Sequence, residues 1–257
     1  MRTPTIEVES FHNSPLGDGG KLPYLQPMNT AVENVLQRNQ SNFRSVIDFN
    51  PKTEKLIKLD FTAANTGLTA TDISNTETFS KYIHNKLTEA NAKYGIGGYN
   101  EDRVLYKRSN LFNGEEERTI HLGIDIWGAT GTKVYVPQGG VVHSFASNNN
   151  FGDYGATIIL QHQLETIIFY TLYGHLSLND LSNLKEGKYV SRGEVIGHFG
   201  NAEENGNWPP HLHFQVIKDV RLYKGDYPGV STINEREKYL ANCPNPDLIL
   251  NMMQYVS

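Results

Sequence analysis

From Tyr94 onward, the chain consists of short runs rich in β-branched and aromatic residues, separated from one another by Gly, Asn, Asp or Pro. The runs are VYVPQGGVVHSFA, YGATIILQHQ, TIIFYTLYGHL, EVIGHFG and HLHFQVI. Such residues fit a pleated, half-buried surface, and the residues between the runs are typical of tight turns. The pattern predicts an antiparallel β domain, which we place at about residues 95–220, in a chain that is mainly β and α+β overall.

The first 94 residues have a different texture, which predicts an N-terminal extension with two helices. After Pro27, apolar residues recur at helical spacing and predict the first helix. The segment Ser74-Asn75-Thr76-Glu77 has the form of a capping box, and the apolar residues after it share one helical face until Gly95, which predicts the second. A short strand is expected between the helices. Residues 221–257 are expected to be a tail that packs on the β domain.

Composition and charge exclude several classes of function. With 38% hydrophobic and 11% aromatic residues, the chain is too apolar to be disordered. A formal net charge of −5 offers no basic surface for phosphate backbones, so no nucleic-acid partner is expected. No stretch approaches the roughly 20 apolar residues of a membrane span, and the start of the chain lacks the apolar run of an export signal. We therefore expect no membrane insertion and a cytoplasmic location, or export if a targeting segment is missing from this sequence.

Histidine is the residue type most able to carry chemistry here. All nine histidines except His12 and His84 lie in the predicted β half. The single cysteine, Cys243, excludes an internal disulfide and a cysteine-rich zinc site. Any metal site must therefore be built from His, Asp and Glu. The sequence does not fix the oligomeric state.

The first candidate motif is His121-Leu122-Gly123-Ile124-Asp125, which places an imidazole and a carboxylate four residues apart. On a straight strand these residues would lie about 13 Å apart, much too far to share a metal ion. The chain must therefore bend between them, and Gly123 is the residue that permits it. The alternative interpretation is a hydrogen-bonded His-Asp pair at the end of a strand.

Two further motifs add imidazoles to the same half of the chain. In His211-Leu212-His213, alternate residues of a strand point the same way, so both imidazoles can enter one cavity while Leu212 packs on the opposite face. One of the pair can bind a metal while the other faces substrate. His175 ends an apolar run. Two His and one Asp would leave the fourth zinc position for water, as a catalytic site requires, whereas a closed structural site would need a fourth ligand.

Together, His121-x-x-x-Asp125, the isolated His175 and His211-x-His213 resemble the M23 family of zinc metallopeptidases, of the lysostaphin and LytM type. The resemblance covers roughly Tyr94 to Ile217, and the glycine-punctuated segment 187–197 resembles the family's turn before the second histidine motif. The flanking segments are also similar to M23 segments found in larger bacterial chains beside kinase-like and aminotransferase domains.

The resemblance implies both a fold and a set of roles. It implies an antiparallel β peptidase domain in which His121, Asp125 and His213 hold one Zn²⁺ per chain and His175 and His211 are the catalytic histidines. The implied activity is endopeptidase hydrolysis of peptide bonds, with glycine-rich or peptidoglycan-like peptides as the usual substrates. The chain has no HExxH motif, which fits histidines rather than a glutamate as the proton-transfer groups. Which histidine is the base and which stabilises the oxyanion stays open.

Four residues next to these motifs are candidates for substrate contact. Tyr99 and Asn100 lie in a glycine-rich loop before the first motif, and Asn207 and Trp208 precede the His211 motif. Asn100 has two further interpretations, either as a cap on the open zinc position or as an ordinary turn asparagine.

Two alternative functions stay open at this point. The chain could be a non-catalytic metal-binding or regulatory domain of the same fold, or a hydrolase of another amide. The intact set of five motif residues argues against the first alternative, because degenerate members of the family typically lose ligands.

Overall fold

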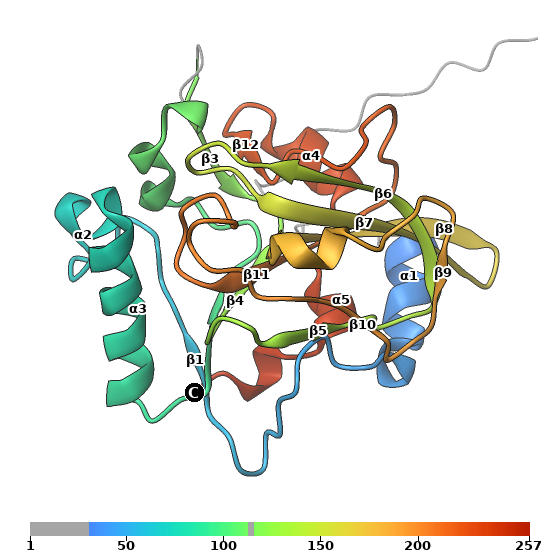
Figure 1. The fold of residues 1–257 in the computed structure, drawn as a ribbon, viewed down its shortest axis with the longest axis horizontal. Helices are drawn as coiled ribbons and strands as arrows, with labels where there is room; N and C mark the ends of the chain where they lie inside the picture. Colours follow the sequence, from blue (N-terminus) through green and yellow to red (C-terminus); the bar gives the residue numbers. More distant parts are fainter. Residues whose placement is uncertain (1–30, 113–115) are drawn as a thin grey trace, which may run out of the picture.

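Residues 31–112 and 116–257 are described by a computed structural model of the chain (Figure 1). Expectations that concern residues 1–30, including the start of the first helix, lie outside the described residues. Helix α1 (Ala31–Arg38) is the first described element.

A mixed sheet of eight strands forms the centre of the described fold (Figure 1). Its strands, in spatial order, are β1 (Leu56–Lys58), β2 (Tyr94–Gly97), β4 (Ile124–Trp127), β11 (His211–Ile217), β8 (Ile167–Leu176), β7 (Gly155–Leu164), β6 (Gly140–Asn148) and β9 (Tyr189–Val190). Neighbouring strands are antiparallel except β1 and β2, which are parallel. The predicted antiparallel β domain is confirmed, and strands form in each of the apolar runs.

Two small sheets flank the large one. Strand β5 (Lys133–Tyr135) pairs with β10 (Val195–His198), and β3 (Arg118–His121) pairs with β12 (Val230–Thr232). The chain therefore leaves a small sheet at His121 and enters the large sheet at Ile124. The bend that the spacing of His121 and Asp125 requires falls between these two sheets.

Gly123 lies in this bend, and the structure gives it a second reason to be glycine. A Cβ atom at this position would lie 2.5 Å from Cε1 of His213 and 2.9 Å from the carbonyl oxygen of Phe214. These distances are far inside van der Waals contact, so any side chain would displace the imidazole. From the sequence, the need for glycine at position 123 follows from the bend alone. The close approach of Gly123 to His213 is a second reason that only the tertiary structure shows.

The other helices are α2 (Ala70–Ser74), α3 (Thr76–Glu89), α4 (Arg236–Asn242) and α5 (Asp247–Leu250), with the 3₁₀ turns η1 (Gln40–Asn42), η2 (Val104–Arg108), η3 (Asn110–Phe112), η4 (Leu178–Leu181) and η5 (Met253–Tyr255). The predicted second helix is present as α3, but its cap differs from the prediction. Asn75 alone caps α3 by accepting hydrogen bonds from the N–H groups of Glu77 and Thr78. The reciprocal capping box belongs to α2, between Thr69 and Asp72. None of the helices in the described ranges is long and apolar enough to cross a membrane.

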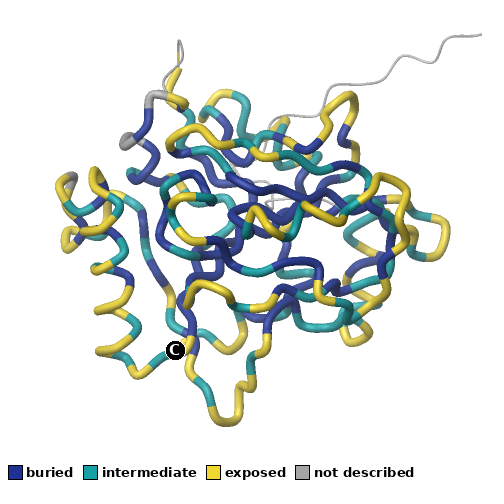
Figure 2. The backbone as a smooth tube through the Cα atoms, in the orientation of Figure 1, coloured by how far each residue is buried: buried dark blue, intermediate teal, exposed yellow. Residues whose placement is uncertain are grey.

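Strand β11 lies inside the large sheet and is buried along its whole length. Leu212, Phe214 and Val216 belong to the hydrophobic core, as the alternation of the strand predicts. The opposite face of the strand carries His211, His213 and Gln215. In Figure 2 the central strands are mostly dark blue, whereas much of α2 and α3 is yellow. The polar face of β11 is thus held in a rigid, buried setting.

The extension and the tail both join the central region. Strand β1 of the extension adds to the large sheet, and β12 of the tail pairs with β3. Phe79 of α3 packs edge-on against Phe61, and both rings contact Trp127 of β4. The division into residues 1–94, 95–220 and 221–257 stays a prediction.

Candidate metal centre

The register of three neighbouring strands brings the motif residues together. His213 of β11 is directly opposite Asp125 of β4 on one side and Gly174 of β8 on the other. His175 follows Gly174, and His211 is opposite Trp127. The three sequence motifs therefore meet at the centre of the sheet.

His121, Asp125 and His213 form a buried group that could hold a metal ion. Nε2 of His121 lies 3.0 Å from Nδ1 of His213 and 3.2 Å from Oδ1 of Asp125. Nδ1 of His213 lies 3.0 Å from the same carboxylate oxygen. In a tetrahedral site with bonds of about 2.0 Å, two ligand atoms lie about 3.3 Å apart, so this triangle has the size that zinc requires.

In His121 and His213, the nitrogen outside the triangle has a hydrogen-bond acceptor as its partner, which fixes the tautomer of the ring. Nδ1 of His121 donates to the carbonyl oxygen of Gly98 at 2.9 Å, and Nε2 of His213 donates to Oε1 of Gln215 at 2.9 Å. A neutral imidazole carries one proton, so the remaining nitrogens present lone pairs. Three lone pairs, two from nitrogen and one from Asp125, thus face one point with no proton between them, and a cation satisfies all three.

The electrostatics of this group favour a neutral His121 and an ionised Asp125. Burial and, to a smaller extent, the charge of Arg103 lower the pKa of His121 to about 4. Burial alone would raise the pKa of Asp125, but His121 and Arg103 outweigh it and hold that pKa well below its ordinary value. Both groups are therefore in the protonation state that metal ligation needs.

His175 and His211 form a second pair beside the first group. Their rings stack with centroids 4.0 Å apart, and His211 also stacks on Trp127 at 3.9 Å. Nδ1 of His175 donates to the carbonyl oxygen of Asn205 at 2.8 Å, and Nδ1 of His211 donates to that of Pro209 at 2.7 Å. Their Nε2 atoms therefore carry lone pairs, and no hydrogen bond from a described residue occupies them.

Burial keeps this pair neutral. Desolvation lowers the pKa of His211 to about 4 and holds that of His175 well below its ordinary value. His175 also has a φ of 61°, in the left-handed region that few non-glycine residues adopt. Strained backbone of this kind persists where the surroundings over-determine it, as they do at functional sites.

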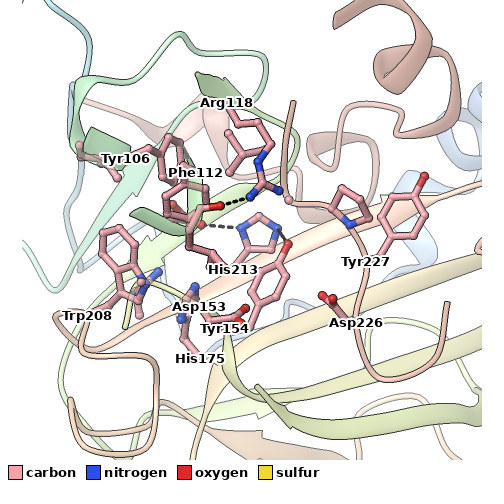
Figure 3. Close-up of a pocket in the computed structure, with 18 of the residues that line it drawn as sticks. Tyr106, Phe112, Arg118, Asp153, Tyr154, His175, Trp208, His213, Asp226 and Tyr227 are labelled. Atoms are coloured by element: carbon pink, nitrogen blue, oxygen red, sulfur yellow. Dashed lines mark hydrogen bonds and ion pairs between the residues drawn. The ribbon is translucent and has the colours of Figure 1, made fainter. Parts of the chain in front are cut away.

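A cavity of about 270 Å³ opens onto both groups. Figure 3 shows His175, His213 and Tyr154 within it, with Trp208 on one side and Tyr227 and Asp226 on the other. The Tyr154 hydroxyl lies 3.5 Å from Nε2 of His213. The lining residues are Leu105, Tyr106, Leu111, Phe112, Arg118, Asp125, Trp127, Gly152, Asp153, Tyr154, His175, Trp208, His211, His213, Tyr223, Asp226, Tyr227, Pro228, Gly229 and Val230.

The four predicted substrate contacts are placed differently from one another. Trp208 lines the cavity. Asn100 has a φ of 60° and accepts a hydrogen bond from Nε of Arg236 at 2.7 Å. The Tyr99 hydroxyl donates to the carbonyl oxygen of Cys243 at 2.5 Å. Tyr99, Asn100 and Asn207 are not among the lining residues. The side chains of Tyr99 and Asn100 instead form hydrogen bonds with the C-terminal region. Their role in substrate binding stays a prediction.

Among the residues whose side chains contact the motif residues, Gln215, Tyr154 and Arg103 were not predicted from the sequence. Gln215 accepts a hydrogen bond from Nε2 of His213, and its place two residues after His213 on a strand could have indicated this shared face. Tyr154, which precedes β7, contacts the same imidazole, and Arg103 contacts Asp125. No local pattern marks these last two, because their contacts depend on tertiary structure.

The central part of the chain is similar to a known protein family. Residues 119–225 match the profile of peptidase family M23. No curated protein matches the chain. The predicted resemblance to the M23 family is confirmed, whereas the similarity to chains with aminotransferase domains stays a prediction.

Several solved structures are also similar. A zinc-containing peptidase from Vibrio cholerae is 29% identical over 38% of this chain and 27% of its own, with a TM-score of 0.31. Helicobacter pylori Csd3 is 27% identical over 49% of this chain and 32% of its own, with a TM-score of 0.32. The catalytic domain of lysostaphin from Staphylococcus simulans is 23% identical over 62% of this chain and 96% of its own, with a TM-score of 0.38. The chain thus spans only a minor part of the first two.

Proposed function

Because residues 119–225 match peptidase family M23, we propose that this protein is a zinc metallopeptidase that hydrolyses peptide bonds at the cavity lined in part by residues of β4, β11 and β8. The observation that carries the proposal is the triangle of lone pairs of His121, Asp125 and His213, which lies beside two neutral imidazoles. We assign one zinc ion per chain to this triangle. His175 and His211 are the catalytic residues of the proposal.

A bound zinc ion would supply Lewis acidity, which polarises a peptide carbonyl and acidifies water. The protein's own contribution is to hold the proton acceptors in place. Nε2 of His175 and Nε2 of His211 are free to take a proton, because carbonyl oxygens already hold the Nδ1 protons. After taking a proton, either imidazolium can stabilise negative charge on a substrate oxygen or return the proton to the leaving amine.

We further propose that the substrate is a glycine-rich or peptidoglycan-like peptide cleaved internally. The cavity has a volume of about 270 Å³, and several aromatic side chains line it, among them Trp208, Tyr154 and Tyr227, so a peptide with small side chains fits it better than one with bulky side chains. Family membership of residues 119–225 supports the same class of substrate.

The test combines metal analysis with cleavage profiling. Purified protein should contain about one zinc per chain, and a chelator should remove both the metal and any activity. Incubation with oligoglycine, muropeptides and unrelated amides, followed by mass spectrometry of the products, identifies the cleaved bond. His211→Ala should keep the zinc and lose cleavage, whereas His143→Ala, on β6 and outside the cavity lining, should keep both.

Two results would contradict the proposal in different ways. A zinc-loaded protein that cleaves none of these substrates would favour the non-catalytic alternative. A protein whose His211→Ala variant cleaves as fast as the parent would show that the imidazole pair takes no part in the reaction.

A further inference from the structure

The loop that follows β2, residues 98–103, contacts the first metal-binding candidate, His121, although the loop lies upstream of the segment that matches family M23. The N–H group of Asn100 donates to the carbonyl oxygen of His121 at 2.8 Å, and the N–H group of His121 donates to that of Glu101 at 2.9 Å. The carbonyl oxygen of Gly98 holds the imidazole itself at 2.9 Å. His121 is thus bound from three directions by residues 98–101.

The same loop supplies Arg103, whose side chain is fully buried. Nη1 of Arg103 donates to Oδ2 of Asp125 at 2.5 Å, and Nε donates to Oε2 of Glu101 at 2.8 Å. The guanidinium lies over the ring of Phe61 at 5.4 Å. Both carboxylates are nearly buried as well, with 5% and 8% of their side-chain surface exposed.

A buried guanidinium between two carboxylates is expensive to desolvate, and such an arrangement adds little to stability compared with apolar packing. Its geometric consequence for Asp125 is more specific. Arg103 occupies Oδ2, whereas Oδ1 is the oxygen that lies 3.2 Å from His121 and 3.0 Å from His213. The rigid fork of the guanidinium keeps the carboxylate from rotating, because Glu101 holds its other edge.

We propose that Arg103 is a positioning residue of the metal centre, which holds Asp125 so that Oδ1 alone is presented to zinc. Through Glu101, the loop 98–103 places both His121 and Asp125. The metal centre of this protein therefore depends on a segment outside residues 119–225. This inference rests on the metal-binding part of the proposed function and does not require that the protein cleave peptides.

The experiment measures zinc affinity in the full chain, by competition with a chromophoric chelator. Arg103→Gln removes the charge and the fork, Arg103→Lys keeps the charge but loses the fork, and Arg44→Gln removes a surface arginine paired with Asp48 as the matched control. Loss of a partner of this kind typically weakens metal binding about 10- to 100-fold, which we expect for Arg103→Gln. Arg103→Lys should give a smaller weakening, and Arg44→Gln none.

A second readout separates positioning from general stability. The visible absorption of the Co²⁺-substituted protein depends on coordination number and geometry, so it should change in Arg103→Gln if Asp125 becomes free to rotate. A purely structural arginine would lower the melting temperature of the metal-free protein yet leave the zinc Kd and the Co²⁺ spectrum of the folded protein unchanged. That result would overturn the proposal.

The milder variant keeps the test decisive if Arg103→Gln does not fold. Arg103→Lys must then bind zinc more weakly than Arg44→Gln, and an equal Kd for the two would overturn the proposal. A parent protein that binds zinc but cleaves no peptide would remove the proposed function and leave this inference open to the same measurement.

Discussion

The two buried histidine groups of this protein, the triad of His121, Asp125 and His213 and the pair of His175 and His211, differ in what their lone pairs face. In the triad, three lone pairs face one another at 3.0 to 3.2 Å. In the pair, the rings stack at 4.0 Å and each Nε2 atom has no hydrogen-bond partner among the described residues. The triad can therefore bind a cation, whereas the pair can accept a proton or contact a substrate.

Another buried histidine, His162, has a hydrogen-bond partner at both ring nitrogens and serves as a comparison. His162 of β7 is buried like the others, with 1% of its surface exposed, but both of its nitrogens have partners. Nδ1 lies 3.2 Å from the carbonyl oxygen of Gly139, and Nε2 lies 2.7 Å from Oγ1 of Thr171. Burial is therefore common to all these histidines, and only the partners of the nitrogens separate a ligand, a proton acceptor and a core residue.

The largest expected effect is the loss of a triad nitrogen. His213→Ala removes one of three protein ligands, so the zinc content should fall from about one ion per chain to a level that is not measurable. Inductively coupled plasma mass spectrometry of dialysed protein measures it, with His143→Ala as the control. Full zinc content in His213→Ala would show that the triad is not the metal site.

Loss of an imidazole from the pair should leave the metal in place and slow the reaction. For His211→Ala and His175→Ala we expect kcat to fall about 10²- to 10⁴-fold, the usual contribution of a general acid or base. Steady-state cleavage of the best substrate measures the effect alongside zinc content. If either variant loses its zinc instead, the division between triad and pair is wrong for that residue.

Removal of the partner of His213 should have an intermediate effect. Gln215→Leu leaves the Nε2 proton of His213 with only the distant Tyr154 hydroxyl, so the imidazole is no longer held in one tautomer and orientation. We expect zinc binding to weaken about 10- to 100-fold. Gln163→Leu on the exposed part of β7 is the matched control. Equal zinc affinities in the two variants would show that Gln215 only fills space.

The last prediction concerns the stability of the fold rather than metal binding or cleavage, and the effect, which is due to His162, appears only in acid. Burial lowers the pKa of His162 from 6.5 to about 4. Between these two pH values the imidazole is therefore protonated in the unfolded chain but neutral in the folded protein. The free energy of unfolding should be unaffected by this group above pH 6.5 and fall by up to about 1.4 kcal/mol per pH unit from there to pH 4.

Urea unfolding of the parent and of His162→Gln at pH 7.5, 5.5 and 4.5 isolates this contribution. The variant should lose less stability than the parent between the first and last of these pH values, because the glutamine does not titrate. Parallel losses in the two proteins would mean that His162 is protonated in the fold.

The strands and the motif residues were predictable because they depend on local rules. Alternation in HLHFQVI places Leu212 in the core and both histidines on the other face, whatever the rest of the chain does. The spacing of His121 and Asp125 required a bend, and the structure has one between β3 and β4. The predicted cap of α3 is wrong, because several neighbouring polar residues can each cap a helix and the choice depends on where the preceding helix ends.

The sequence by itself determined which side chains can act as ligands and which face of each strand carries them, because residue chemistry and strand period are properties of the chain. Tertiary structure alone decided that Arg103 reaches Asp125, that Gln215 holds His213, and that Tyr99 and Asn100 contact the C-terminal region. Those contacts join residues distant in the sequence or depend on side-chain orientation, and only packing and hydrogen bonding in the folded protein select them.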